Sequence, residues 1–166
     1  FQELIKNNYL NNNVNKKNLI FIFNICNFLK INLKKIIPTL NKFKGLRFRN
    51  EIVINGKKIK VINDSKSTSF SSTQELIYTK KKTFWILGGL PKKGDKFTLS
   101  KKDCFNLRAY IFGKNAKFFV KRLKDKVHYQ KFNNMISAIK KIKIDFKKEQ
   151  WSNEKIILFS PASASF

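Results

Sequence analysis

The segment 61–69 constrains the fold more than any other part of the chain. Two β-branched residues, Val61 and Ile62, close an apolar run, and an Asn-Asp step, a lysine and several hydroxyl side chains then follow at once. In α/β proteins, ligands bind beyond the carboxyl ends of the strands. The segment is therefore interpreted as a strand that runs directly into a polar binding loop.

Two later segments repeat this pattern. An apolar run at 84–87 ends at Gly88 and Gly89 and continues to Lys92, and another at 156–159 runs into a Ser-Pro-Ala-Ser-Ala-Ser sequence at 160–165. Because parallel strands end at the same edge of a sheet, the three loops are predicted to converge on one site.

Hydrophobic periodicity predicts strands that alternate with helices, and hence an α/β fold with a mostly parallel sheet. The Asn55-Gly56 step predicts a hairpin, and Asn32 is expected to cap the helix that runs to about residue 43. Ser71 or Ser72 is expected to cap the helix at 70–79, with Gln74 or Glu75 as the capping-box partner. The expected helices span 15–30, 32–43, 70–79, 98–104, 116–123 and 132–141, the last with Met135, Ile136 and Ile139 on one face, and the expected strands span 51–54, 57–62, 83–87, 107–112, 127–129 and 155–159.

The formal net charge of +26 invites a nucleic-acid partner, but the composition does not favour one. The 36 basic residues include only four arginines, although proteins that recognise nucleic acids favour Arg for its planar, bidentate geometry. Lys, Asn, Ile and Phe make up about half of the chain and share A/T-rich codons, so codon bias accounts for most of the charge. A basic nucleic-acid-binding module remains an alternative.

Other broad features limit the class of protein. No apolar run reaches the roughly 18 residues of a membrane span, so no membrane partner is expected. Cys26 and Cys104 lie in apolar stretches and are expected to be buried free thiols. The chain begins with Phe1 rather than Met and is expected to be a piece of a longer protein.

Each loop residue has a plausible chemistry of its own. The Asp64 carboxylate can accept hydrogen bonds from ribose hydroxyls or a base, and Lys66 and Thr68 can donate to phosphate or carboxylate oxygens. Lys92 adds a second cation on the next loop. An anionic, small-molecule ligand suits this set.

The ordered set of segments resembles the Mur ligase family. Its members carry a G-L-x-H-R pattern, an N-D-S-K-A-T-N loop, a G-G-x-x-K strand end and an S-P-A-C-A-S segment, which correspond to residues 45–49, 63–69, 88–92 and 160–165. The D-S-K element points to the D-glutamate-adding branch. The family helix start H-N-x-x-N corresponds to residues 14–18.

The resemblance implies two domains. Residues 1–44 would be the helical C-terminal end of a central ATPase domain, and residues 45–166 a Rossmann-like C-terminal ligase domain, truncated at its end. It implies that Thr68, Lys92 and Ser165 hold D-glutamate. It further implies that Asn18, Arg49 and Asp64 contact ATP, while Lys66 lies between the nucleotide and the amino acid.

The implied reaction is ATP-dependent amide formation in cytoplasmic peptidoglycan precursor synthesis. The carboxylate of UDP-N-acetylmuramoyl-L-alanine is phosphorylated, and the amine of D-glutamate attacks the acyl phosphate. ATP and Mg²⁺ would be bound mainly by the central domain, whose phosphate loop has no counterpart in these residues. The resemblance thus implies a monomeric ligase of which this part holds no catalytic residue or metal ligand and is inactive alone.

Four positions depart from the family pattern. Phe48 and Val14 stand where histidines are usual and so remove polar groups from the implied ATP side. Ser69 and Ser163 replace an asparagine and a cysteine. Another Mur-type or folylpolyglutamate-type ligase is an alternative within the class, although the D-S-K loop argues against it.

Overall fold

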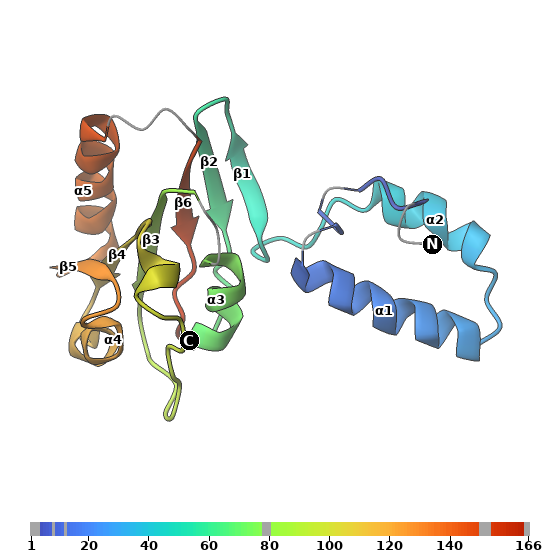
Figure 1. Cartoon of the computed structure of the whole chain (residues 1–166), viewed down its shortest axis with the longest axis horizontal. Helices are drawn as coiled ribbons and strands as arrows, with labels where there is room; N and C mark the ends of the chain where they lie inside the picture. The colour runs from blue at the N-terminus through green and yellow to red at the C-terminus, as the bar shows by residue number, and fades with distance from the viewer. Residues whose placement is uncertain (1–3, 8, 12, 78–80, 150–153, 165–166) are drawn as a thin grey trace. The chain divides into compact units, whose positions relative to one another are not determined.

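The computed structural model describes residues 4–7, 9–11, 13–77, 81–149 and 154–164. The chain forms two compact units, the first ending at Leu46 and the second beginning at Arg47 (Figure 1). The assignment of residues 1–44 and 45–166 to two domains of a ligase stays a prediction.

The first unit contains two helices, α1 (Asn13–Phe28) and α2 (Leu33–Lys42). Their apolar positions build a small core in which Leu19 and Leu40 are buried with Ile5 and Leu10. The Asn32 side chain accepts a hydrogen bond from the Lys34 N–H at 3.0 Å and so caps α2. Both helices and this cap agree with the sequence prediction.

The second unit is built on a six-stranded sheet with the order β1-β2-β6-β3-β4-β5. Every neighbouring pair is parallel except β1 and β2, which form the predicted hairpin. The mostly parallel α/β fold is therefore confirmed. The strands are β1 (Glu51–Asn55), β2 (Ile59–Asn63), β3 (Thr83–Gly88), β4 (Leu107–Phe112), β5 (His128–Phe132) and β6 (Lys155–Phe159), and the helices are α3 (Phe70–Ile77), α4 (Ala116–Leu123) and α5 (Met135–Lys148).

Successive side chains of the central strand β3 point to opposite faces of the sheet and contribute to a separate core on each face. Trp85 and Leu87 pack in one core with α3 and α4, whereas Phe84 and Ile86 pack in a second core with α5. All six residues of β3 are buried. The central position of β3 explains why its sequence is a continuous apolar run rather than an alternating one.

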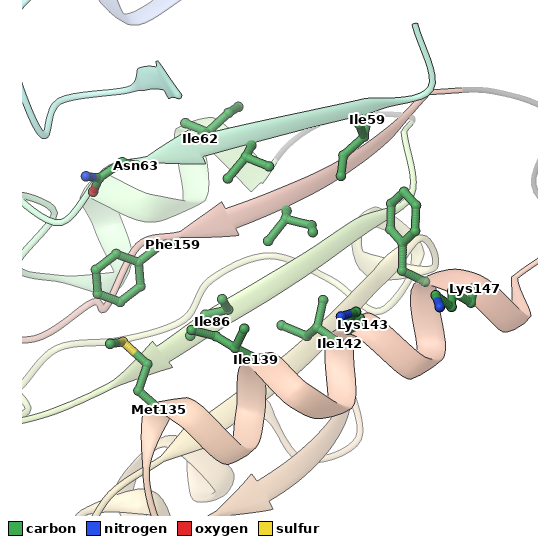
Figure 2. A pocket seen from close by; sticks show the side chains of 13 residues that line it. Ile59, Ile62, Asn63, Ile86, Met135, Ile139, Ile142, Lys143, Lys147 and Phe159 are labelled. Atoms are coloured by element: carbon green, nitrogen blue, oxygen red, sulfur yellow. The ribbon is translucent and has the colours of Figure 1, made fainter. Parts of the chain in front are cut away.

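The α5 face of the sheet is only partly covered. A helix is about 10 Å wide and strands lie about 4.8 Å apart, so one helix covers roughly two strands. α5 packs on β3, β4 and β5. Beside it, β2 and β6 border an open apolar groove of about 490 Å³ (Figure 2), lined mainly by Ile59, Val61, Ile86, Met135, Ile139, Ile142, Phe146, Ile157 and Phe159.

The apolar face predicted for α5 is not the face that packs on the sheet. Met135 and Ile139 line the open groove and Ile136 is 64% exposed, whereas the buried positions of this helix are Ala138, Ile142 and Asp145. The helix itself is present, but it is rotated so that a small residue and a carboxylate reach the sheet.

Two smaller predictions about the helices also fail. Ser69, not Ser71 or Ser72, caps α3, because the Ser72 N–H donates to Ser69 Oγ and the Ser69 N–H to Ser72 Oγ. The predicted helix 98–104 is reduced to a 3-10 turn, Lys102–Cys104. Gln74 Oε1 instead accepts hydrogen bonds from the N–H groups of Thr98 and Leu99.

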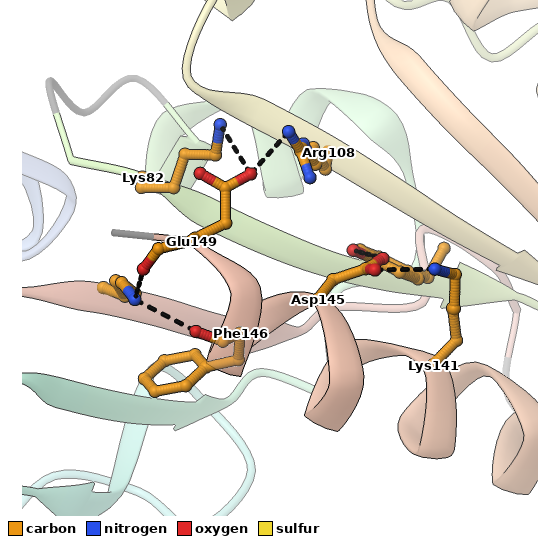
Figure 3. A network of polar contacts seen from close by, with 8 residues as sticks. Lys82, Arg108, Lys141, Asp145, Phe146 and Glu149 are labelled. Carbon is orange, nitrogen blue, oxygen red and sulfur yellow. Dashed lines mark hydrogen bonds and ion pairs between the residues drawn. The ribbon is translucent and has the colours of Figure 1, made fainter. Parts of the chain in front are cut away.

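A buried carboxylate fixes α5 to the sheet (Figure 3). Asp145 accepts a hydrogen bond from the Tyr110 hydroxyl at 2.8 Å and pairs with the Lys141 ammonium at 2.6 Å. Burial alone would raise the pKa of Asp145, but the hydrogen bonds from Lys141 and Tyr110 bring it below its ordinary value. At the end of the helix, Glu149 pairs with Arg108 at 2.5 Å.

Asp145→Asn should lower the free energy of unfolding at pH 7 by about 1–3 kcal/mol, because a buried charged acceptor is lost. The folded-state pKa of Asp145 is lowered, so its contribution is complete above the ordinary Asp range and is lost as the pH falls through the folded-state value. Urea unfolding of both proteins between pH 7 and pH 3 should show the difference shrinking toward acid.

The matched control is Asp125→Asn, the same change at an exposed position whose φ of 67° suits asparagine. It should change stability by no more than about 0.5 kcal/mol. Equal effects of the two substitutions would contradict a special role for the Asp145 carboxylate.

Candidate functional site

The three predicted loops leave adjacent strands at one edge of the sheet. β2, β6 and β3 are neighbours and run parallel, so the loops 64–69, 160–164 and 89–98 begin side by side (Figure 1). Hydrogen bonds continue the strand pairing into these loops: the Asp64 N–H donates to Phe159 O at 2.7 Å, and the Gly88 N–H donates to Pro161 O at 3.2 Å. The predicted convergence of the loops is therefore present in their backbones.

Asp64 is the centre of the polar contacts at this edge. Its carboxylate is buried, with 6% of the residue exposed. One oxygen accepts from the Asn50 N–H at 2.9 Å, and the other accepts from the hydroxyls of Ser67 and of Ser160, the latter at 3.0 Å. A carboxylate that accepts three hydrogen bonds from three segments acts as a structural joint between them.

Ser160 extends this joint into the core. Its Oγ lies 2.8 Å from Thr73 Oγ1 on α3, and its carbonyl oxygen accepts from the Trp85 indole N–H at 2.7 Å. Ser160, Thr73 and Trp85 are each fully buried. The Ser160 and Thr73 hydroxyls and the Trp85 indole N–H each have a hydrogen-bond partner, as polar groups buried in a core require.

Gly88 and Gly89 allow the β3 loop to pass close to other protein atoms. Their φ angles are 150° and 120°, and a Cβ on Gly88 would lie 2.2 Å from Phe112 O. A Cβ on Gly89 would lie 2.5 Å from Ser163 Oγ. These close contacts with other protein atoms account for both glycines.

The loop after β3 is also tied to the loop after β6. The Ser163 hydroxyl donates to Gly88 O at 2.9 Å, and the Ala164 N–H donates to Leu90 O at 2.9 Å. Lys92 follows two residues later and is exposed. Ser165 lies outside the described residues, so its predicted proximity to Thr68 and Lys92 stays a prediction.

Two exposed cations, Arg49 before β1 and Lys66 after β2, lie on turns that are hydrogen-bonded to each other. Lys66 is held by its N–H, which donates to Phe48 O at 3.1 Å, and Arg49 follows Phe48 directly. Phe48 and Asn50 on either side of Arg49 have φ angles of 65° and 47°. The turn thus presents the Arg49 side chain from a tight, left-handed bend.

The remaining predicted contacts have less support. Thr68 is half-buried at the end of the β2 loop, beside the start of α3. Asn18 is exposed on α1 in the first unit. The described residues contain no group of three His, Cys, Asp or Glu side chains suited to a metal, and none of the described helices is long and apolar enough to cross a membrane.

Sequence reasoning missed two polar residues that organise these loops. Asp95 Oδ2 accepts from the Phe70 N–H at 2.7 Å, and Asn115 Nδ2 donates to Gly89 O at 3.0 Å. Neither belongs to a motif that was singled out. The only available signal was the position of Asp95, three residues after Lys92 in the same loop.

The fold and the loops together define a Rossmann-like domain with a polar edge at the carboxyl ends of its strands. Structural comparison finds the same fold in MurF from Acinetobacter baumannii, with a TM-score of 0.56 and 14% identity over 81% of this chain and 32% of that one. A second crystal structure of the same protein covers 83% of this chain, also with a TM-score of 0.56. At this identity the likeness establishes the fold alone.

Sequence comparison identifies the relatives more closely. The UDP-N-acetylmuramoylalanine–D-glutamate ligase of Wolbachia sp. subsp. Brugia malayi is 33% identical over 153 residues, which are 92% of this chain and 30% of the relative. The ligase of the same name from Francisella philomiragia is 33% identical over 156 residues, which are 92% of this chain and 36% of the relative. The chain spans about a third of the length of these curated relatives. No family model matches the chain.

The predicted resemblance is thereby confirmed: the chain is a homologue of the Mur ligases over 92% of its length. Its sequence relatives carry the name of the D-glutamate ligase, in agreement with the D-S-K loop.

Gly88→Ala should destabilise the second unit by more than about 3 kcal/mol, because the new methyl group meets a backbone oxygen and the φ angle is unfavourable. Gly94→Ala is the control: its φ is 79° but nothing lies within 4 Å of the added Cβ, so only about 1–2 kcal/mol is expected. Thermal unfolding measures both. Similar losses in the two variants would contradict the close approach at Gly88.

Proposed function

We propose that this chain is part of an ATP-dependent ligase that adds D-glutamate to UDP-N-acetylmuramoyl-L-alanine. The observation that carries the proposal is the 33% identity to relatives with that name, together with the D-S-K loop at the carboxyl end of β2. The product would be a peptidoglycan precursor made in the cytoplasm, which connects the enzyme to cell-wall growth, cell shape and division.

Thr68, Lys92 and Ser165 are proposed to bind D-glutamate. Thr68 and Lys92 lie on loops that leave β2 and β3, and the loop after β6, which leads to Ser165, is bonded to both strand ends. A dicarboxylic amino acid needs several donors around its carboxylates, and an ammonium with two hydroxyls supplies them. Binding both carboxylates would fix the amine, so that it faces the activated carbonyl.

Arg49 and Lys66 are proposed to neutralise negative charge on the ATP side, and Asn18 is proposed to contact ATP, as the resemblance implies. Asp64 is proposed to position these two cations. Its carboxylate accepts hydrogen bonds from the N–H of Asn50, next to Arg49, and from the hydroxyl of Ser67, next to Lys66. Mg²⁺ is proposed to be held mainly by the central ATPase domain of the ligase, as the resemblance implies.

The proposed chemistry makes modest demands on this part of the enzyme. ATP supplies the phosphoryl group that activates the alanyl carboxylate, and phosphate leaves when the amine attacks. The residues of this chain bind, orient and neutralise charge, which are the terms that lower the barrier when reactants are held in place. This part alone is therefore proposed to be inactive, and the whole ligase to act as a monomer.

Lys92→Ala in the full-length ligase should raise the KM for D-glutamate about 10- to 100-fold, because a charged hydrogen-bond donor to a carboxylate is lost. The KM for ATP should change little. Phosphate release in the presence of UDP-N-acetylmuramoyl-L-alanine, ATP and varied D-glutamate measures this.

The matched control is Lys93→Ala, which removes the same charge from the next residue of the same exposed turn. Its KM values should remain close to those of the parent. If Lys92→Ala and Lys93→Ala behave alike, the proposed role of Lys92 is wrong. If the unaltered ligase forms no product with D-glutamate, the proposed function itself is wrong.

A further inference from the structure

Asp95 connects two loops that the sequence motifs treat separately. It lies in the loop after β3, where its N–H donates to Lys92 O at 3.2 Å and closes a turn. Its side-chain Oδ2 accepts from the Phe70 N–H at 2.7 Å. Phe70 is the first residue of α3 and follows Thr68 by two positions. One carboxylate therefore spans the short distance between the Lys92 turn and the Thr68 loop.

The segment after Asp95 is fixed to the core. Phe97 is buried and packs edge-on against Phe70, with ring centroids 5.5 Å apart, and its carbonyl oxygen accepts from the Lys126 ammonium at 3.0 Å. The Asp95 carbonyl oxygen accepts from Arg122 Nε at 2.7 Å. The Arg122 guanidinium in turn lies 3.4 Å from the centroid of the Phe118 ring.

The other end of the same loop is also anchored. Leu90 O accepts from the Ala164 N–H at 2.9 Å, and Gly89 O accepts from Asn115 Nδ2 at 3.0 Å. The exposed turn that carries Lys92 is thus anchored on both sides, at residues 89–90 before it and at residues 95–97 after it. On the second side, the Asp95 carboxylate bonds directly to the backbone N–H of Phe70, two residues after Thr68.

We propose that Asp95 is a positioning residue for the amino-acid substrate: its bond to the Phe70 N–H sets the spacing between Thr68 and the Lys92 ammonium. This rests on the proposed function, in which those two side chains grip D-glutamate. A pocket for a short dicarboxylic acid requires donors at a fixed separation, and small displacements of such groups are costly to binding. Asp95 itself does not contact the substrate.

The test uses the full-length ligase and three variants. Asp95→Ala removes the acceptor and should raise the KM for D-glutamate about tenfold, with the KM for ATP within about twofold of the parent. Asp95→Asn keeps a side-chain oxygen for the Phe70 N–H and should restore most of the D-glutamate affinity. Thermal unfolding of each variant separates a loss of folding from a loss of positioning.

Asp103→Ala is the control, because Asp103 lies further along the same connection to β4 and caps a local turn: it accepts from the Ser100 N–H at 2.9 Å and from its hydroxyl at 2.6 Å. It should leave the KM for D-glutamate unchanged.

An unchanged KM for D-glutamate in Asp95→Ala would overturn the inference. So would an equal rise in the KM values for D-glutamate and ATP, since that pattern indicates a general structural role. If the unaltered ligase does not use D-glutamate, the proposed function is wrong, and this inference, which depends on it, is wrong as well. A parent that uses D-glutamate normally while Asp95→Ala does so too would refute the inference alone.

Discussion

The buried carboxylate of Asp64 is the interaction on which the polar edge of the sheet depends. It joins the turn before β1, the loop after β2 and the loop after β6 through three donors. An unpaired carboxylate at this depth would be strongly destabilising, so the loops have to keep these donors in place. Because two of the donors, Asn50 and Ser67, directly follow Arg49 and Lys66, the same requirement fixes the backbone positions of these two exposed residues.

The edge therefore combines a rigid interior with a short exposed layer. Ser160, Thr73 and Trp85 are fully buried and hydrogen-bonded, whereas Lys66 and Lys92 emerge one or a few residues beyond such anchors. Binding residues placed on loops of a rigid scaffold lose little conformational freedom when a ligand arrives. This arrangement suits a site that must hold small, highly charged substrates.

Most of the fold could be predicted from the sequence because local signals and burial agree there. The Asn55-Gly56 hairpin, the continuous apolar run of β3 and the Asn32 cap each have a short-range physical cause. The three loops could be predicted for the same reason, because each follows a recognisable strand.

The failures have tertiary causes. On α5 the apolar residues Met135, Ile136 and Ile139 share a face, but the face that packs on the sheet is another one. It holds Asp145, whose partner, the Tyr110 hydroxyl, comes from β4. In the segment predicted as a helix at 98–104, only Lys102–Cys104 forms a helical turn, and the N–H groups of Thr98 and Leu99 bind Gln74, 24 residues earlier. Such partners are brought together only by the folded chain.

The scarcity of acidic residues makes their positions informative. The chain has ten Asp and Glu residues against 36 Lys and Arg, so cations are in large excess over the acidic side chains that could pair with them. Several acids instead bind backbone N–H groups at turns and helix starts, as Asp64, Asp95 and Asp103 do. A surface ion pair contributes little, whereas a carboxylate that satisfies a backbone donor fixes the path of the chain. In a lysine-rich protein, a carboxylate bound to a backbone N–H is therefore a better guide to the architecture of a site than the abundant cations around it.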